Sequence, residues 1–301
     1  MTLVRMTQNM LSRQSFSGMQ TAMSRVAKAQ EQLTTGRLIN RPSDDPTGAT
    51  SAMRIRSSLA AQKQYVRNAD DAVGWLDQSD STLQEATTQI SRARDIALQG
   101  ANSGALGQKA LDALATEVDQ IRDGLITTAN AKYLDRPIFG GITSGAQAYL
   151  PDGTLADPDA IGTASGVVRT VADGARIRID VEGPAAFGPE GDSVFKHLDD
   201  LSIALKGGDS VAIQGAIGKL KADSDRVSNA QADIGARTVR VENARSVATD
   251  ATLTLSNALS SVENVDLAKA TVDLGLTQVA YQAALGATAK ALQSSLLDFL
   301  R

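Results

Sequence analysis

Apolar residues recur every three or four positions along most of this chain, which is the spacing of an amphipathic α-helix. The spacing predicts a helix within residues 1–33, a long helix from about 48 to 101, and a third helix over 111–125. At a rise of 1.5 Å per residue, the second helix would be about 80 Å long. In the first helix the stripe consists of Phe16, Met19, Met23, Val26, Gln30 and Leu33.

The second half of the chain repeats this pattern. Apolar residues keep the helical spacing from 217 to 262, which predicts another long helix, and a last helix follows the sequence "ENVD". Alanines flank the stripe of this last helix, and small residues beside larger ones let helix axes approach closely, as in a coiled coil or bundle. The stripe itself consists of Leu267, Leu274, Tyr281, Leu285, Leu292 and Phe299.

The composition changes abruptly between the two helical halves. Residues 137–191 hold five of the seven prolines and ten of the 25 glycines. Alternating residues in "ARIRIDVE" (175–182), together with "AQAYL" and "VVRTV" before it, predict short strands joined by turns. An insert of this size is marginal as an independent folding unit, so we expect it to lean on the helices. A short helix, "DSVFKHLDDLSIAL", is predicted to follow it.

The predicted fold is therefore mainly α. Long antiparallel helical rods, or a coiled-coil bundle, are formed by the N- and C-terminal arms, with a small β-rich central insert. The terminal segments have apolar stripes but few aromatic residues, so we expect them to become ordered by packing on a partner, such as other copies of the chain. The predicted divisions are an N-terminal assembly helix and turn (1–47), an N-terminal rod (48–136), the insert (137–192), a C-terminal rod (193–264) and a C-terminal assembly helix (265–301).

The stretch "TTGRLINRPSDDPTGA" (34–49) interrupts the first helical half and raises the question of a binding site. A calcium loop needs alternating oxygen ligands and a glutamate at its twelfth position, and "DDPTGATSAMRI" has neither. A phosphate loop needs a different glycine spacing and a lysine. Adjacent Asp44 and Asp45 do not converge on a shared proton, and no base or nucleophile is visible nearby.

A turn between two helices explains the same residues better. Gly36 ends one helix, Pro42 forces Arg41 out of the helical region, and either aspartate caps the next helix, with Pro46 in its first turn. The residues assigned to this structural turn are Gly36, Pro42, Asp44, Asp45, Pro46 and Gly48.

The composition leaves little room for catalysis or metal binding. Cysteine is absent, and His197 is the single histidine, so thiolate sites, histidine-rich metal sites and Ser-His-Asp triads are disfavoured. We expect His197 to be an ordinary helix residue and Trp75 to pack at a helix seam. No enzyme activity, cofactor or metal is predicted.

The net charge of −4 combines a basic N-terminal part with an acidic remainder. Residues 1–67 carry ten Lys or Arg against three acids, which gives +7 and leaves −11 for the rest. The basic residues are dispersed and not interleaved with aromatics, so nucleic-acid binding is disfavoured. An organellar transit peptide is a minor alternative for the first 30 residues, but they keep a helical register that the C-terminal stripe matches. No apolar run has the length of a signal-peptide core or a membrane span, so no membrane partner is expected.

Four motifs resemble those of the bacterial flagellin superfamily, and within it the hook-filament junction proteins. They are "QLTTGRLINRPSDDPTGA" (32–49), "VRNADDAVGWLDQSDSTLQEATTQISRARDIALQGANSG" (66–104), "NAKYLDRPIFGG" (130–141) and "LTQVAYQAALGATAKALQSSLLDFLR" (276–301). Flagellins tend to carry a different turn, an Asn-Gly motif in place of "IFGG", and a different ending. The resemblance is therefore nearer to the junction proteins, although the short insert departs from familiar forms.

This resemblance implies a structural component of the flagellum, needed for filament attachment and motility. It implies type III export without a cleaved signal peptide, and an extracellular position at the hook-filament junction. The implied partners are other copies in a ring, the first hook-associated protein, flagellin and an export chaperone. On the matching helices, the implied partner-binding residues are Met19, Met23, Val26, Leu33, Leu274, Tyr281, Leu285, Leu292, Leu296 and Phe299.

Two alternatives stay open at this point. One is a flagellin proper, which is a polymer subunit of the filament. The other is an enzyme or ligand-binding domain in the insert, which would require a pocket among residues 142–192.

Overall fold

The computed structural model of the protein describes residues 8–102, 107–162 and 166–299. The chain forms two compact units. We call residues 1–60 with 252–301 the terminal unit, and residues 61–251 the central unit. The long helices α2 (Pro46–Ala101) and α6 (Ser210–Glu263) contribute to both units.

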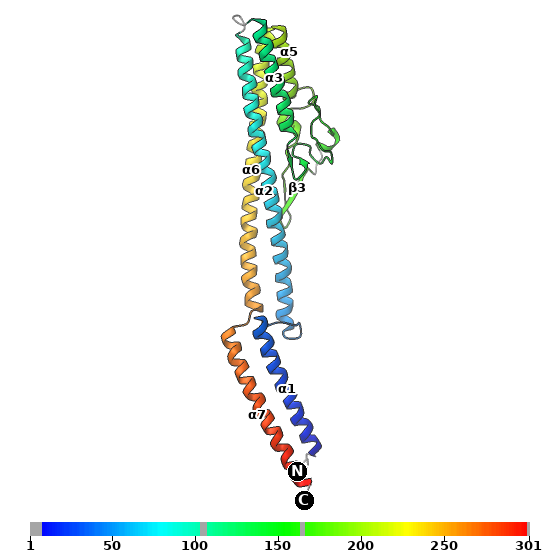
Figure 1. The fold of residues 1–301 in the computed structure, drawn as a ribbon, viewed down its shortest axis with the longest axis vertical. Coiled ribbons are helices and arrows are strands. Elements are labelled where there is room, and N and C mark those ends of the chain that lie inside the picture. Colours follow the sequence, from blue (N-terminus) through cyan, green and yellow to red (C-terminus); the bar gives the residue numbers. More distant parts are fainter. Residues whose placement is uncertain (1–7, 103–106, 163–165, 300–301) are drawn as a thin grey trace. The chain divides into compact units, whose positions relative to one another are not determined.

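The terminal unit is built around two helices that lie side by side and run in opposite directions. They are α1 (Gln8–Thr35) and α7 (Leu267–Phe299) (Figure 1). Both helices were predicted from the sequence. The beginning of α2 and the end of α6 complete this unit.

The central unit is a helical bundle. Within it α2 and α6 run antiparallel, and α3 (Gln108–Ala129) packs on α5 (Val194–Gly207) (Figure 1). The predicted apolar stripes form its core: Leu76, Leu83 and Ile90 of α2 are fully buried, as are Val227 and Val241 of α6. The sequence therefore predicted both the helices and their buried faces. The bounds differ at several ends: α2 begins at Pro46 instead of about 48, α3 extends beyond the predicted 111–125, and α6 begins at Ser210 instead of 217.

Four short strands form two antiparallel hairpins in the middle of the chain. β1 (Lys132–Tyr133) pairs with β2 (Arg136–Pro137), and β3 (Val168–Ala172) pairs with β4 (Ala175–Arg178). The second hairpin confirms the strands expected in "VVRTV" and "ARIRIDVE". The first hairpin was not predicted, because two-residue strands carry no alternation. A 3-10 turn (η2, Pro158–Ala160) and a five-residue helix (α4, Gly183–Phe187) complete the insert.

The prediction of a strand in "AQAYL" is wrong, because this segment forms only an isolated bridge between Tyr149 and Leu155. The backbone there is held by a side chain. Asn130 Oδ1 accepts hydrogen bonds from the N–H groups of Ala148 (2.8 Å) and Tyr149 (2.9 Å), and Asn130 Nδ2 donates to the Tyr149 carbonyl (2.8 Å). Asn130 thus satisfies one edge of this segment, and the other edge pairs only locally, through hydrogen bonds from Leu150 N–H to the Thr154 carbonyl and from Ala156 N–H to the Ala148 carbonyl (2.9 Å each).

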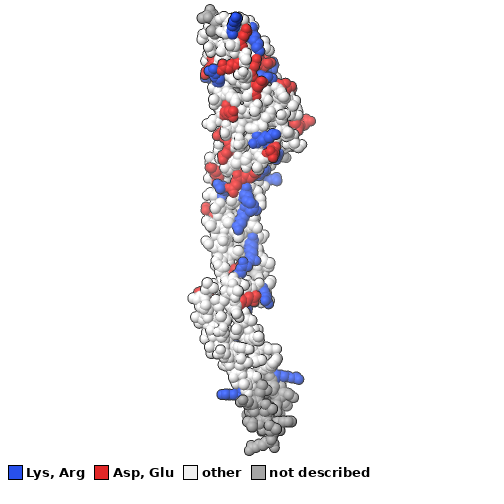
Figure 2. Space-filling model, viewed as in Figure 1, with Lys and Arg blue, Asp and Glu red and all other residues white. Residues whose placement is uncertain are grey.

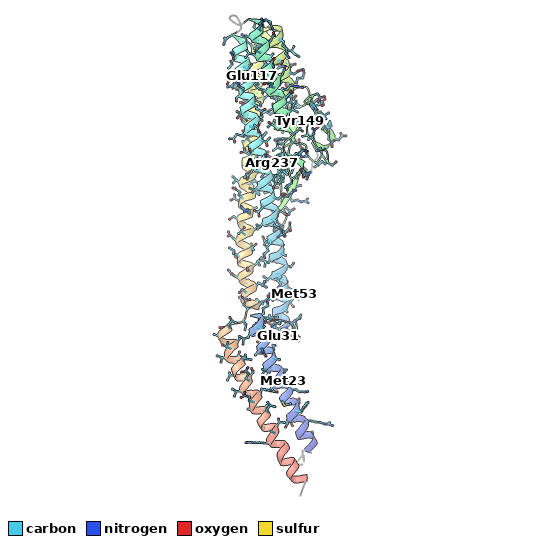
Figure 3. The ribbon with its side chains drawn as sticks, in the orientation of Figure 1. Met23, Glu31, Met53, Glu117, Tyr149 and Arg237 are labelled. Atoms are coloured by element: carbon cyan, nitrogen blue, oxygen red, sulfur yellow. The ribbon has the colours of Figure 1, made fainter. Side chains whose placement is uncertain are left out.

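The insert leans on the long helices, as expected. Arg169 Nε lies 2.6 Å from an oxygen of Asp71 on α2, and Asn68 Nδ2 donates to the Thr170 carbonyl at 2.7 Å. From α6, Arg237 donates to the Asp180 carbonyl at 2.7 Å (Figure 3). A cluster of buried aromatic rings fills its base: Phe139, Tyr149, Phe187 and Phe195.

Candidate assembly surface and its joint

The predicted turn is a joint in which two loops of the terminal unit pair with each other. Gly36 has φ +68°, the left-handed conformation that ends a helix and that glycine adopts without strain. Val265 N–H donates to the Gly36 carbonyl at 3.0 Å, and Leu38 N–H donates to the Glu263 carbonyl at 2.6 Å. The loop after α1 is thereby hydrogen-bonded to the loop between α6 and α7.

The two adjacent aspartates have different roles. Asp45 caps α2, since its Oδ1 accepts from the Thr47 N–H at 3.1 Å and its carbonyl accepts from the Ala49 N–H. Asp44 instead closes the preceding turn, where its Oδ2 accepts from the N–H groups of Asn40 (3.2 Å) and Arg41 (2.9 Å). The sequence left open which aspartate is the cap, and the structure assigns this role to Asp45.

Lysine and arginine side chains tie the joint to α1. Lys28 Nζ lies 3.0 Å from Asp44 Oδ1. This hydrogen bond, together with the one from the Arg41 backbone, holds the pKa of Asp44 below its ordinary value. Glu31, also on α1, pairs with Arg41 at 3.4 Å in an exposed position (Figure 3). Asp44 therefore connects α1 to the turn that leads into α2.

The most buried charge of the joint is Glu263, which is 5% exposed. Its Oε2 accepts a hydrogen bond from Arg56 Nη2 at 2.8 Å. Sequence reasoning missed Lys28, Arg56 and Glu263 as joint residues. The only signal available was that Glu263 directly follows the apolar stripe of the 217–262 helix, which does not identify its partner.

Gly48 and Pro46 complete the start of α2. A Cβ at Gly48 would overlap the Asp45 carboxylate and the end of the Ile39 side chain, so a larger residue here would require both side chains to move. Pro46 is the first residue of the helix, where its missing N–H costs nothing. Pro42 is exposed in the turn, in which Asp44 N–H donates to the Arg41 carbonyl at 2.9 Å.

The residues proposed to bind partners fall into three groups. Met19, Val26, Leu33, Leu274 and Tyr281 are half-buried, whereas Leu285 is exposed. Met23, labelled in Figure 3, is 61% exposed. The side chains of Leu292, Leu296 and Phe299 lie outside the described residues. The buried residues of α1 and α7 include two with small side chains, Ala29 of α1 and Ala270 of α7. The structure thus brings the two stripes to one helix pair without burying them.

A second apolar row on α7 was not singled out from the sequence. It consists of Val272, Leu276 and Val279, each more than 60% exposed. At 3.6 residues per turn, this row lies on the side of α7 opposite Ala270, Leu274 and Tyr281. A helix that is apolar on two faces is normally buried on both, and large exposed apolar patches mark interaction sites.

His197 and Trp75, which were considered for a chemical role, have structural roles. His197 is 3% exposed and lies between two carboxylates, with Nδ1 2.7 Å from Asp223 and Nε2 3.0 Å from Asp192. Trp75 packs edge-on against Tyr133, with ring centroids 5.7 Å apart, at the contact between α2 and the β1–β2 hairpin. Among the described residues, no group of three or more His, Asp or Glu is placed to hold a metal ion. None of the described helices is both long and apolar enough to cross a membrane.

Comparison with known families gives matches in both arms. The N-terminal helical region of bacterial flagellin matches residues 6–142, and the C-terminal helical region of bacterial flagellin matches residues 217–300. The part of the chain between these two regions contains most of the insert.

The relatives of this chain include both a hook-associated protein and a filament protein. The chain is 24% identical to flagellar hook-associated protein 3 of Escherichia coli (strain K12), over 76% of this chain and 70% of that protein. It is 27% identical to the flagellar filament 33 kDa core protein of Treponema phagedenis, over 92% of each. Among solved structures, FlgL of Bacillus cereus has a TM-score of 0.59 and 26% identity, covering 69% of this chain and 99% of that chain.

Proposed function

Because this chain belongs to the bacterial flagellin family and is a structural protein of the flagellum, not an enzyme, we propose that it is a hook-associated junction protein. In this role it links the hook-proximal junction ring to the flagellin filament. Its partners are other copies of itself, the first hook-associated protein and flagellin, with an export chaperone before secretion. It is exported by the flagellar type III route and acts outside the cell.

The observation that carries this proposal is the terminal helix pair. In α7 one apolar row faces α1, while the row of Val272, Leu276 and Val279 is exposed. Burying an exposed apolar side chain stabilises an interface by about 1.5–3 kcal/mol. The uncovered rows of α1 and α7, which include Phe16 and Met23, therefore favour burial against neighbouring subunits.

The junction role is favoured over the filament role by three sequence features and by the relatives. "PSDDP", "IFGG" and "LLDFLR" stand where flagellins tend to differ. The Escherichia coli relative is named flagellar hook-associated protein 3, and the Bacillus cereus structure is that of FlgL, so neither is named a flagellin. The second candidate, a filament subunit, is favoured by the match to the Treponema phagedenis core protein, which spans 92% of each chain.

Two experiments separate these candidates. Purified full-length protein is incubated with filament seeds, and its elongation into long filaments by itself would contradict the junction role. In the second experiment the gene is deleted, and flagellin in the medium is measured together with motility. We expect shed flagellin monomers and lost motility, since flagellin has nothing to attach to. Cells that keep attached filaments of normal length would contradict the assignment.

A further inference from the structure

The β1–β2 hairpin presents an apolar side chain on a strained turn. Tyr133 pairs with Arg136, so the loop between the strands consists of only Leu134 and Asp135. Both have positive φ (47° and 63°), and in the described part of the chain no other residue except glycine does. Such a turn favours Asn-Gly, because residues with a branched or bulky side chain are strained in the left-handed region. Leu134 nevertheless stands there, and it is 75% exposed.

The hairpin that carries this leucine is held firmly on α2. Trp75 packs edge-on against Tyr133, and the guanidinium carbon of Arg136 lies 5.8 Å from the centre of the Trp75 ring. The Tyr133 hydroxyl lies so near Gly74 that a Cβ there would overlap it. Backbone strain persists only where the surrounding structure fixes it, and it is concentrated at sites that bind or switch. Leu134 is therefore an apolar side chain fixed in an exposed position.

The outer side of α6 carries an apolar row that no part of the described chain covers. Val239 and Val247 are 56% and 68% exposed, and Asn243, also exposed, lies between them. On a helix with 3.6 residues per turn these three side chains span about 80°, whereas buried Val241 lies about 160° from Val239. Arg237, labelled in Figure 3, reaches the insert from the same side of α6 as Val241. The row therefore faces away from both α2 and the insert.

The row and the hairpin lie on opposite sides of the central unit at about the same level. In Figure 1, α2 lies between α6 and the strands of the insert. The ion pair between Asp70 and Arg245 (2.7 Å) fixes the register of the two antiparallel helices. Five residues farther along α2 and five back along α6, Trp75 is about level with Arg240. Because each strand of the hairpin has only two residues, Leu134 lies within about 10 Å of that level.

Charges of both signs flank these two apolar features. Lys132 and Asp135 are exposed on the hairpin, and Arg240 and Glu242 are exposed on either side of the row. In the described part of the chain, none of the four takes part in an ion pair. Figure 2 shows charged side chains of both signs on and around the insert, so a partner that binds there must also offer both. A second copy of this chain does, with Arg240 for Asp135 and Glu242 for Lys132.

We propose that the β1–β2 hairpin of one copy of this chain binds the outer side of α6 in a second copy. Leu134 then packs between Val239 and Val247, and the flanking charges of the two surfaces pair. This inference rests on the proposed function, in which copies stand in the same orientation around one axis. Such copies touch through opposite sides. A contact between features at one level needs no displacement along the axis, so it can close into a ring.

A designed pair of cysteines tests the contact directly, because the chain contains no cysteine of its own. Leu134→Cys/Asn243→Cys is expressed in the deletion strain, and its flagella are isolated, oxidised and separated on a denaturing gel without reductant. The two positions lie on opposite sides of one chain, so a disulfide can join only different copies. We expect a ladder of linked dimers, trimers and larger species, detected with an antibody against this chain.

The matched control for this experiment is Leu134→Cys/Ser228→Cys. Ser228 is exposed on the same side of α6 but lies about 22 Å from Asn243 along the helix. It should therefore give monomers after oxidation.

Exchange of charge tests the contact by a second route. Asp135→Arg and Arg240→Asp should each raise the flagellin shed into the medium about fivefold, because like charges would then face each other. The double variant Asp135→Arg/Arg240→Asp should return shedding to the wild-type value, since it restores the pair with reversed signs. Lys109→Asp, which reverses an exposed lysine of α3, should have no effect.

A further variant separates strain from binding. Leu134→Asn suits the left-handed turn, so it should fold at least as well as the wild type, which circular dichroism and thermal unfolding verify. It should still raise shedding, because asparagine cannot replace a buried leucine. Leu134→Met, which keeps an apolar side chain, should leave shedding near the wild-type value.

In a strain whose deletion sheds flagellin, oxidised flagella that give only monomers of this chain would overturn the proposal, and so would charge reversals that leave shedding unchanged. A product that stops at the dimer would also overturn it, since it would show that the two copies use the same surface. In these cases the contact is wrong and the proposed function stands. A ladder in a strain whose deletion leaves the filaments attached would instead support the contact and contradict the proposed function.

Discussion

Arg56 and Glu263 are 207 residues apart in the sequence, yet their side chains form the most buried ion pair of the joint. Glu263 is almost inaccessible to water, whereas the Arg56 side chain is half-exposed. A buried carboxylate that loses its partner retains the cost of desolvation without the compensating attraction.

Arg56→Ala should therefore destabilise the terminal unit by about 1–3 kcal/mol, measured by urea denaturation. Arg54→Ala is the matched control, since Arg54 is exposed two residues away and, in the described structure, has no ion pair. It should change the free energy of unfolding by less than about 0.5 kcal/mol. Equal effects of the two substitutions would show that Arg56 does not stabilise Glu263.

The surroundings of His197 predict that the stability of the central unit depends on pH. Its hydrogen bond to Asp223 raises the pKa of His197 above the ordinary value, although burial acts in the opposite direction. Asp192 also faces the ring, Arg226 pairs with both aspartates, and the nearby Lys219 opposes the charged form. The charged imidazolium can donate from both ring nitrogens, which links α5 to α6 and to the preceding loop.

A pKa raised by folding stabilises the protein at pH values below the ordinary pKa, and this stabilisation is lost as pH rises through the folded pKa. The urea concentration at the denaturation midpoint should therefore decrease as the pH is raised from about 6 to about 9. In His197→Gln the midpoint should be lower at pH 6 and nearly independent of pH over this range, because the chain has no other histidine. A wild-type midpoint that rises with pH would contradict the ion-pair role.

At the scale of elements, the start of α2 depends on a glycine. A Cβ at Gly48 would overlap the Asp45 carboxylate and Ile39, so Gly48→Ala must displace the cap that begins the helix. We expect a destabilisation of about 1–3 kcal/mol, measured by thermal unfolding.

Gly215→Ala in α6 is the matched control, because a Cβ there meets nothing within 4 Å. It should stabilise the helix by about 0.5–1 kcal/mol, since alanine has the higher helix propensity. Opposite signs for the two substitutions would support the close packing at Gly48. If Gly48→Ala were also stabilising, the cap would not depend on that packing.

At the scale of the whole molecule, substitutions in the exposed row of α7 should impair assembly without impairing folding. Leu276→Glu/Val279→Glu changes two side chains that are each 64% exposed. The free energy of unfolding of the isolated chain should change by less than about 1 kcal/mol. Motility of a deletion strain carrying this variant should nevertheless be lost, because two charges would have to be buried between subunits.

Val211→Glu is a control for this experiment, since Val211 is an even more exposed apolar residue at the start of α6 in the central unit. It should leave both unfolding and motility unchanged. Full motility of Leu276→Glu/Val279→Glu would show that the outer row of α7 is not buried on assembly.

The amino-acid sequence by itself determined the helices, the position of the insert and the turn at residues 34–49. These features depend on local spacing: apolar residues at helical intervals, Gly36 for a left-handed helix end, and Pro46 for a helix start. The same spacing predicted the buried stripes of α2 and α6 correctly, because one face of each helix must leave water.

Tertiary structure alone decided which side chains meet. Either aspartate of the turn has the chemistry of a cap, and only the folded backbone assigned Asp45 to α2 and Asp44 to Lys28. His197 was expected to be an ordinary helix residue, and only the fold places its ring between Asp192 and Asp223. In the same way, "AQAYL" alternates like a strand, yet Asn130 satisfies its backbone. The physical reason is that periodicity reflects bonds within one helix, whereas these contacts join segments that only folding brings together.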